Sequence, residues 1–402
     1  MSTPPLRDEP HERPPAVPRF RDGTVYPLFV FVCVRVVISI CGVVFVSEQP
    51  PNPSVVGPGA PPARYTEPAT PGLHNALDGM QRWDAAWFRW IADEGYGTDD
   101  ARAAFLPGYP LLIALTSLAT PLDHAASATL VSNIAFALSL IVLFALTRFE
   151  RPDDRTAWRS VALFASLPTS FFFLALFSEA PFLLATLLAF YWARTGRWGW
   201  RVAASGFAAC LIRSMGVAVV IALVVEALRH RSSNGPRRSA RLGAAAAGLV
   251  APMAYGLWWW TRGAPLRPIR AQAYWDRELT FPLVALADGL SAGWRAVTSG
   301  APWLVVDAVL VTIALFAAVG AWRRLAGSYA TYVWISLAIP LSYAVPWRPL
   351  LSVPRLAAVL FPASWVGVEV IRARASFAML VAASLALQIA LAVRFMNWGW
   401  IW

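Results

Sequence analysis

The sequence contains no lysine, so all 34 of its basic residues are arginine. Only 14% of its 402 residues are charged, whereas roughly 25% are charged in an average soluble domain. This shortage of charge excludes an ordinary soluble enzyme. The net charge of +11 therefore bears on membrane orientation and anionic lipid rather than on nucleic acid. The use of arginine alone, with frequent alanine and proline, indicates a GC-rich bacterial genome.

Cysteine and histidine are also scarce. Cys33, Cys41 and Cys210 all fall inside apolar stretches, which excludes a disulfide framework or a cysteine metal site. The four histidines show no metal-ligand spacing, and no Asp-x-Asp motif falls on an expected outer loop. We therefore expect neither a metal nor a cofactor.

Apolar runs dominate the sequence, since 57% of the residues are hydrophobic and the mean hydropathy is +0.52. Many runs are long enough to cross a bilayer as helices. The pattern predicts an all-α, polytopic integral membrane protein with about eleven transmembrane helices and one membrane domain, residues 23–402. Residues 1–22 lack periodicity and predict a disordered cytoplasmic N-terminus. The expected spans are 25–46, 105–120, 127–148, 160–176, 179–194, 201–228, 241–261, 302–321, 329–345, 356–371 and 377–396.

Arginine-rich loops set the expected orientation of these spans. The loops at 229–241, 322–324 and 372–374 are basic, which predicts that they face the cytoplasm. By alternation, residues 47–104 and 262–300 then form the first and second extracytoplasmic loops.

The same alternation places two further loops, 148–159 and 194–201, on the extracytoplasmic side, although each contains arginine. If both were internal, the spans between them would form a re-entrant hairpin with Glu179 at its tip. The sequence leaves both arrangements open.

A short helix is expected within the first outer loop, where tryptophans 83, 87 and 90 share one face. Indole on one side and charge on the other predict that this helix lies in the headgroup plane and does not cross the bilayer. Asp84 stands at its N-terminal end. The carboxylate would lie near lipid phosphates, as catalysis on a lipid-linked substrate requires. The alternative is that Asp84 is an ordinary helix N-cap.

The segment RWDAAWFRWIADEGY, followed by AFLPGYP, resembles the first luminal loop of the PIG-V mannosyltransferase family and its bacterial relatives. Weaker similarity follows in SLPTSFFFLALFSEAPF, LIRSMG, AQAYWDREL and SVPRLAAVLFP. Many relatives have histidine where this chain has Trp87. The resemblance implies a GT-C-like fold and inverting, metal-independent transfer of a mannosyl residue. The donor would be a polyprenyl-phosphate sugar, and the acceptor a lipid or cell-envelope glycan at the extracytoplasmic face of the bacterial plasma membrane.

Roles for particular side chains follow from the resemblance and from their chemistry. Asp84 is the expected general base, ahead of Asp93, which suits an ion pair with Arg89, and of Glu94. Arg355 is expected to hold the donor phosphate, with a lipid anchor as the alternative. Further substrate-binding candidates are Arg82, Trp83, Trp87, Glu179, Gln272 and the mid-span Arg213, whose partner would be Glu179 or Asp84.

Two other classes of function remain as alternatives. A glycolipid transporter or flippase would also use intramembrane arginine and glutamate, but paired repeats with interrupted helices are typical of transporters. The sequence has a single dominant loop near its N-terminus instead. A non-catalytic membrane scaffold of the same family is the third possibility.

Overall fold

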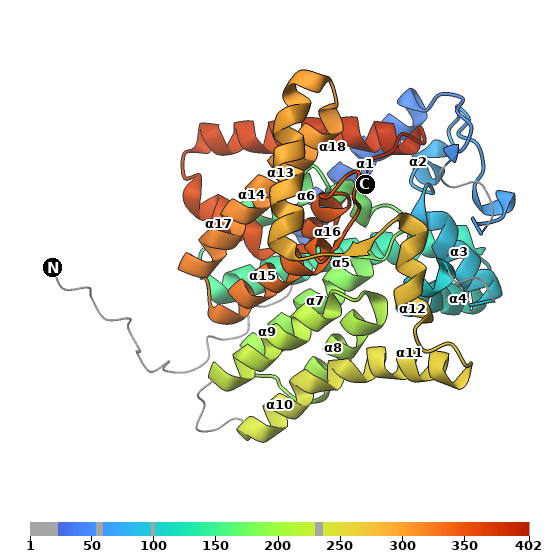
Figure 1. The fold of residues 1–402 in the computed structure, drawn as a ribbon. Coiled ribbons are helices and arrows are strands. Elements are labelled where there is room, and N and C mark those ends of the chain that lie inside the picture. The colour runs from blue at the N-terminus through green and yellow to red at the C-terminus, as the bar shows by residue number, and fades with distance from the viewer. Residues whose placement is uncertain (1–22, 54–58, 98–100, 230–235, 402) are drawn as a thin grey trace.

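The computed structural model describes residues 23–53, 59–97, 101–229, 236–401. The segment 1–22, expected to be disordered, lies outside these residues. The described chain is mostly helical (Figure 1). Its α-helices are α1 (Val25–Phe45), α2 (Asn75–Asp78), α3 (Asp84–Glu94), α4 (Gly108–Ala119), α5 (His124–Glu150), α6 (Asp154–Ser166), α7 (Glu179–Arg194), α8 (Trp200–Ile212), α9 (Gly216–Arg229), α10 (Arg238–Ala246), α11 (Val250–Thr261), α12 (Arg267–Arg270), α13 (Pro282–Ser299), α14 (Pro302–Arg324), α15 (Gly327–Leu341), α16 (Val353–Leu356), α17 (Pro362–Val370) and α18 (Arg374–Met396).

Short 3₁₀ turns and one small strand pair complete the described structure. The 3₁₀ turns are η2 (Ala63–Tyr65), η3 (Ala101–Ala104), η4 (Ser170–Phe173), η5 (Ala247–Leu249), η6 (Ala271–Trp275) and η7 (Ala357–Val359). The strands β1 (Glu278–Leu279) and β2 (Tyr343–Ala344) pair antiparallel, with Glu278 opposite Ala344 and Leu279 opposite Tyr343.

Long apolar helices identify a multi-pass membrane protein. Among the described residues, five helices are long and apolar enough to cross a bilayer, and α16 to α17 make a sixth if their 87° bend is counted as one broken span. Their outward faces carry large apolar side chains, such as Phe29 on α1 and Phe316 on α14, which are 62% and 73% exposed. The expected count of eleven spans is not confirmed. The five helices are Val25–Phe45, His124–Glu150, Arg238–Thr261, Pro302–Arg324 and Arg374–Met396.

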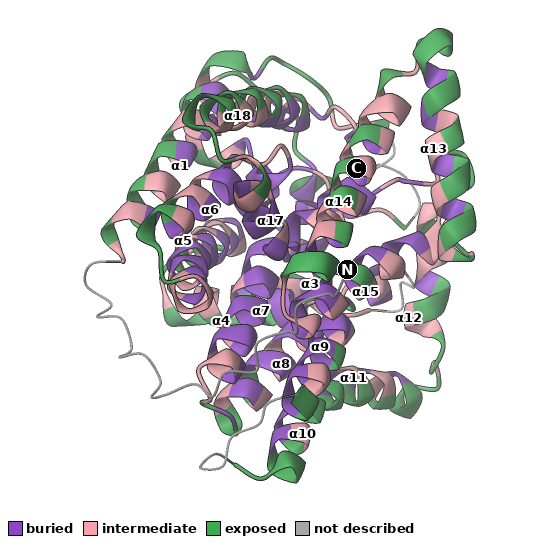
Figure 2. Cartoon of the chain, turned by 90° about the vertical axis from the view of Figure 1, so that its left-hand side faces the viewer, coloured by how far each residue is buried: buried purple, intermediate pink, exposed green. Residues whose placement is uncertain are grey.

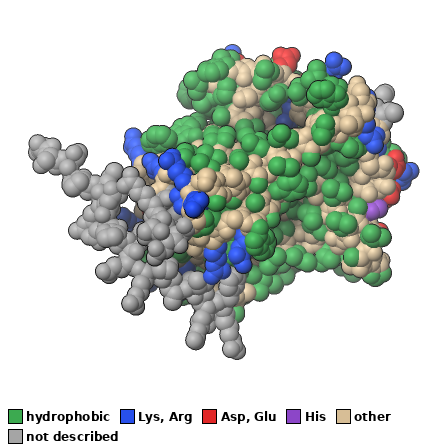
Figure 3. Space-filling view, turned by 90° about the horizontal axis from the view of Figure 1, so that it is seen from below, with side chains coloured by type: hydrophobic (Ala, Val, Ile, Leu, Met, Phe, Trp, Pro, Cys, Tyr) green, Lys and Arg blue, Asp and Glu red, His purple; other side chains and the backbone are tan. Residues whose placement is uncertain are grey.

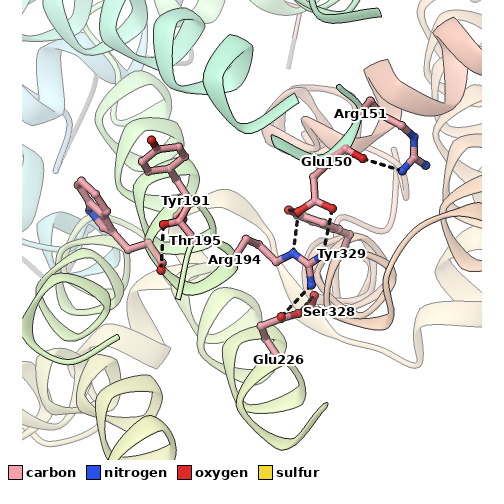
Figure 4. Close-up of polar contacts among 9 residues, drawn as sticks. Glu150, Arg151, Tyr191, Arg194, Thr195, Glu226, Ser328 and Tyr329 are labelled. Carbon is pink, nitrogen blue, oxygen red and sulfur yellow. Dashed lines mark hydrogen bonds and ion pairs between the residues drawn. The ribbon is translucent and has the colours of Figure 1, made fainter. Parts of the chain in front are cut away.

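A network of charged side chains ties several helix ends together (Figure 4). Arg194, at the end of α7, reaches Glu150 of α5 at 2.6 Å and Glu226 of α9 at 2.8 Å. Ser328 and Tyr329, in the first turn of α15, donate to the same two carboxylates at 2.7 and 2.9 Å. The ends of α5, α7 and α9 and the start of α15 therefore meet at one place, which we call the basic end of the molecule.

A second ion-pair group extends the basic end to α14 and α17. Arg151 reaches Glu369 at 2.8 Å, and Arg324 lies 3.9 Å from the same carboxylate. The loops 148–159 and 194–201 therefore lie beside 322–324, which matches the second of the two arrangements left open by the sequence. Figure 3 shows arginine side chains gathered along one side of the molecule.

The expectation of one continuous span over 201–228 was wrong. These residues form α8 and α9, which turn back on each other, so Arg213 lies at the turn rather than in mid-helix. A side chain at Gly216 would place its Cβ only 2.4 Å from the Cα of Cys210, and glycine permits this close return. At about 1.5 Å per residue, α8 and α9 are each shorter than the roughly 30 Å of bilayer hydrocarbon.

The segment expected as the second span, residues 105–120, is also shorter than the bilayer hydrocarbon is thick. It forms the 12-residue helix α4. After α4, the chain returns to α3, because the His124 ring at the start of α5 lies 3.6 Å from Asp93 near the end of α3. The first residues of α5 therefore lie beside the end of α3.

The helices that leave the basic end form three hairpins. The turn between α6 and α7 presents Glu179, the turn between α8 and α9 presents Arg213, and the connection from α15 to α17 presents Arg355. In Figure 2, α7, α8 and α9 are largely buried while α13 and α18 are largely exposed. The three hairpin tips meet the N-terminal end of α3, which carries Asp84.

Of the two segments expected as outer loops, the second is more ordered than predicted. The described part of 47–104 contains α2 and the expected short helix, α3, whereas residues 262–300 contain α12, β1 and the 18-residue helix α13. Helix α13 packs against α14. The β1–β2 ladder fixes the residues that precede α13 against the chain that leads to α16.

The shared basic end predicts the outcome of site-directed labelling. We expect cysteines introduced at the exposed positions Pro152 and Arg197 to be protected together from an impermeant maleimide in intact cells. Cysteines at the exposed positions Pro68 and Leu266 should react, because these residues lie on loops at the other end. The measurement is made with the three native cysteines replaced by serine. Labelling of Pro152→Cys with protection of Arg197→Cys would contradict the arrangement.

Candidate active site

Asp84 is the first residue of α3 and takes part in a buried charged cluster. The N-cap position belongs to Trp83, which has a positive φ of 59° and no side-chain capping bond. The alternative that Asp84 is the N-cap was therefore wrong. Its Oδ2 accepts a hydrogen bond from Nη1 of Arg355 at 2.6 Å. The negative charge also suits the first turn of a helix, where backbone N–H groups are unpaired.

Arg355 connects the two carboxylates of the cluster. While Nη1 binds Asp84, Nε donates to Oε1 of Glu179 at 2.6 Å. Arg213 approaches the other carboxylate oxygen of Glu179 at 2.9 Å, and its Nη1 donates to Ser178 at 2.7 Å. The guanidinium of Arg355 also lies over the ring of Phe177, 4.3 Å from its centroid. The expected partnership of Arg213 with Glu179 is thus present in the structure.

Burial distinguishes the two carboxylates. The side chain of Glu179 is completely buried, whereas that of Asp84 is 25% exposed. A buried carboxylate is tolerated when cations pair with it, as Arg213 and Arg355 do here. Of these two carboxylates, Asp84 is therefore the one that a substrate can reach.

Arg277 is a third arginine beside the cluster, and sequence reasoning did not select it. Its Nη2 donates to the hydroxyl of Ser352 at 3.2 Å. Burial lowers the pKa of Arg277, while Asp84 raises it and Arg355 and Arg213 lower it, so its charge lies within the field of the cluster. The segment AQAYWDREL, part of the family resemblance, contains Arg277 and was the available signal.

Two predicted substrate-binding residues lie apart from the cluster. Arg82 donates from Nε to the backbone oxygen of Met396 at 3.1 Å and lies over the ring of Trp398. Burial lowers the pKa of Arg82 to about 10, and these contacts tie it to the end of α18. Gln272 accepts the backbone N–H of Arg277 through its own backbone oxygen at 3.3 Å, so it supports the loop.

The tryptophans of α3 pack against protein. Trp87 is 3% exposed, because Phe105, Tyr274 and Trp275 surround it at centroid distances of 5.7, 5.4 and 5.5 Å. The prediction that this face meets lipid headgroups is therefore wrong for Trp87. A position of α3 in the headgroup plane stays a prediction.

Trp83 is also committed to aromatic packing. Its ring centroid lies 5.7 Å from that of Trp398 and 5.2 Å from that of Trp400, both in edge-to-face geometry. These contacts join the start of α3 to the C-terminal residues, as Arg82 does. Stacking on a sugar by Trp83 or Trp87 stays a prediction.

The other acidic residues of α3 have partners outside the cluster. Glu94 pairs with Arg64, and Asp93 accepts from Tyr65. Arg89 contacts Gln81 at 3.4 Å, and the expected Arg89–Asp93 pair does not occur among the ion pairs of the described residues. Neither Asp93 nor Glu94 therefore competes with Asp84 for contact with Arg355. Among all the residues that the structure describes, no three His, Cys, Asp or Glu side chains are grouped so that they could hold a metal ion.

The fold and the cluster define a membrane protein with a buried, charged site at the tips of helical hairpins. Residues 60–233 match the model of the mannosyltransferase (PIG-V) family, which confirms the resemblance stated from the sequence. The matched residues include Asp84, Glu179 and Arg213. Arg277 and Arg355 lie beyond them.

Curated mannosyltransferases are similar to part of this chain. The GPI alpha-1,6-mannosyltransferase 2 of Rattus norvegicus is 33% identical over 156 residues, 36% of this chain and 31% of that protein. The protein of the same name from Homo sapiens is 31% identical over 149 residues, 35% of this chain and 29% of that protein. The matches therefore span less than a third of each relative's length.

Two solved structures share a distant likeness. An oligosaccharyltransferase of Archaeoglobus fulgidus in complex with zinc and sulfate aligns with 94% of this chain and 53% of its own, at 15% identity and a TM-score of 0.44. The oligosaccharyltransferase AglB of the same organism, in complex with an inhibitory peptide and a dolichol-phosphate, aligns with 94% and 56%, at 13% identity and a TM-score of 0.43.

The complete burial of Glu179 predicts a large effect on stability. We expect Glu179→Gln to lower the free energy of unfolding by about 3–5 kcal/mol, because Arg213 and Arg355 would keep their charge without this carboxylate. Thermal unfolding of the purified protein in detergent measures the change. The control is Glu94→Gln, which alters an exposed ion pair with Arg64 and should cost at most about 1 kcal/mol. Equal losses in the two variants would show that the cluster does not depend on Glu179.

Proposed function

We propose that the protein is a membrane glycosyltransferase that transfers a mannosyl residue from a polyprenyl-phosphate sugar to a lipid or cell-envelope glycan. The match of residues 60–233 to the PIG-V family and the names of the relatives support this proposal. The reaction takes place at the extracytoplasmic face of a bacterial plasma membrane and inverts the anomeric centre. It needs neither metal nor cofactor.

One observation carries the assignment of the base. Of the two carboxylates bound to Arg355, only Asp84 has an exposed fraction, and Glu179 is fully enclosed. A general base must come within hydrogen-bond reach of the hydroxyl it deprotonates. Asp84 is therefore the catalytic base, and Glu179 is a positioning residue that fixes Arg213 and Arg355.

The reaction requires one bond to form as another breaks. The acceptor hydroxyl oxygen attacks the anomeric carbon of the donor and forms the new glycosidic bond, while its proton passes to Asp84. The bond between the anomeric carbon and the phosphate oxygen breaks, and the polyprenyl phosphate leaves with that electron pair. Attack opposite the leaving group inverts the anomeric centre.

Arg355 has a different part in this scheme from the one expected at first. Its Nε and Nη1 already bind Glu179 and Asp84, so two carboxylates balance its charge. It orients the Asp84 carboxylate. A direct contact between Arg355 and the donor phosphate stays a prediction, and the two ion pairs weaken it.

The distribution of arginine supports the proposal that the site faces the extracytoplasmic side of the membrane. The basic end gathers Arg151, Arg194 and Arg324, and cytoplasmic loops are typically rich in arginine. Helix α7 separates this end from the cluster, since it begins at Glu179 and ends at Arg194, a rise of about 24 Å. The cluster would then face the opposite side, where the sugar of a lipid-linked donor is presented.

A transfer assay tests the proposal. Purified protein in detergent receives polyprenyl phosphate mannose labelled in the sugar, together with a lipid extract as acceptor. We expect the label to appear in a new glycolipid. A flippase would move the labelled donor across a vesicle membrane without forming a new glycosidic bond, and a scaffold would do neither.

The role of Asp84 predicts a specific loss of turnover. Asp84→Asn is nearly isosteric and can still accept the hydrogen bond from Arg355, but it cannot take up the proton. We expect kcat to fall by at least about a hundredfold while the protein still folds. The same assay and thermal unfolding measure both effects. The control is Asp93→Asn on the same helix, which should retain nearly full activity. An active Asp84→Asn enzyme would transfer the role of base to another group.

A further inference from the structure

The charges around the candidate base do not balance. Arg213 and Arg355 pair with the two carboxylates Asp84 and Glu179, and a third guanidinium, that of Arg277, donates to Ser352, which stands three residues before Arg355. Since arginine stays protonated in proteins, the cluster carries one excess positive charge. A partly buried cation without a counterion costs free energy, and a bound anion relieves that cost.

The excess charge can be assigned to Arg277. Arg355 binds both carboxylates and Arg213 binds Glu179, but none of the ion pairs among the described residues includes Arg277. Its hydrogen bond to Ser352 goes to a neutral hydroxyl. Of the three guanidinium groups, Arg277 is therefore the one without a carboxylate partner among the described residues, and its remaining N–H groups are available to a ligand.

The structure holds Arg277 in a defined position. It precedes β1, whose pairing with β2 fixes the strand, and its backbone N–H bonds to Gln272 at 3.3 Å. Just before it in the chain, Trp275 packs on Trp87 of α3. The loop that carries Arg277 is thus anchored to the helix that carries Asp84.

Ser352 brings a second group to the same place. It stands three residues before Arg355 and adopts a positive φ of 68°, which is uncommon for a residue with a side chain. Its hydroxyl accepts from Arg277 and still carries a proton that it can donate. A guanidinium beside a hydroxyl donor suits an anion with several oxygen acceptors, such as a phosphate.

We propose that Arg277 and Ser352 bind the phosphate group of the lipid-linked donor. This inference rests on the proposed function and assigns the leaving group a place in the same site. Asp84 then takes the proton of the attacking hydroxyl, while Arg277 neutralises the charge that develops on the departing phosphate. Arg355 lies between them and keeps the base in position.

A binding experiment tests the phosphate site without any turnover. A fluorescent polyprenyl phosphate and the matching polyprenol are titrated into purified protein in detergent. We expect the wild type to bind the phosphate form at least about tenfold more tightly, which is the effect of one charge-assisted hydrogen bond. Arg277→Gln should abolish this preference, and Arg277→Lys should restore part of it because it keeps the charge.

Controls separate this site from a general attraction for anions. Arg270→Gln removes an exposed arginine from the same segment and should leave the preference unchanged. Inorganic phosphate added as a competitor should displace the lipid only at far higher concentration. If it competes equally well, the site takes free phosphate and the proposal is wrong. An undiminished preference in a folded Arg277→Gln protein would also overturn it.

Kinetics distinguish a failure of this inference from a failure of the proposed function. If the wild type transfers mannose and the inference holds, Arg277→Gln should raise KM for the donor about tenfold or more. An active wild type with an unchanged donor KM in Arg277→Gln would contradict the phosphate site alone. An inactive wild type that still prefers the phosphate form through Arg277 would contradict the glycosyltransferase proposal alone.

Discussion

The shared guanidinium of Arg355 is the interaction on which the candidate site depends. It joins a carboxylate at the start of α3 to one at the tip of a helical hairpin, with both contacts at 2.6 Å. Glu179 is fully buried, and a buried carboxylate is tolerated when cations pair with it. The arrangement of α3 against the three hairpin tips follows from this need, because those tips supply Glu179, Arg213 and Arg355.

Opposite charges also organise the other end of the hairpins. Arg194 binds carboxylates of α5 and α9, and Glu369 binds arginines that follow α5 and end α14. Helix α7 therefore has one terminus in each network. Short helices such as α8 and α9 lack the length of a full span, and these fixed ends give them a defined position instead.

Much of the fold could be predicted from the sequence, since apolar runs define α1, α5, α14 and α18 by length and composition alone. The turn at Arg213 could not be predicted in this way. Residues on both sides of it are apolar, and the reversal depends on a polar partner in α7 and on the close approach at Gly216. Helix α13 was missed because its charged and small residues interrupt its apolar character.

The sequence predicted which residues form the candidate site better than it predicted their roles. The motif around Asp84 identified a carboxylate, and the SVPR segment identified Arg355. Sequence spacing did not reveal that these two side chains bind each other, because 271 positions separate them. Trp87 looked like a ligand-facing ring, but residues from distant segments enclose it. Arg277 was passed over because it lay among several arginines of one segment.

The order in which the partners of Glu179 emerge during synthesis has a consequence for assembly. Arg213 follows soon after Glu179 in the chain, so these two can pair as soon as α8 has been made. Arg355 follows Glu179 by 176 positions, after α14 and α15. The early pair can therefore stabilise an intermediate in the membrane, and Asp84 gains its counterion only after Arg355 has been made. A nascent chain released before Arg355 would contain α1 to α15 but could not complete the charged cluster.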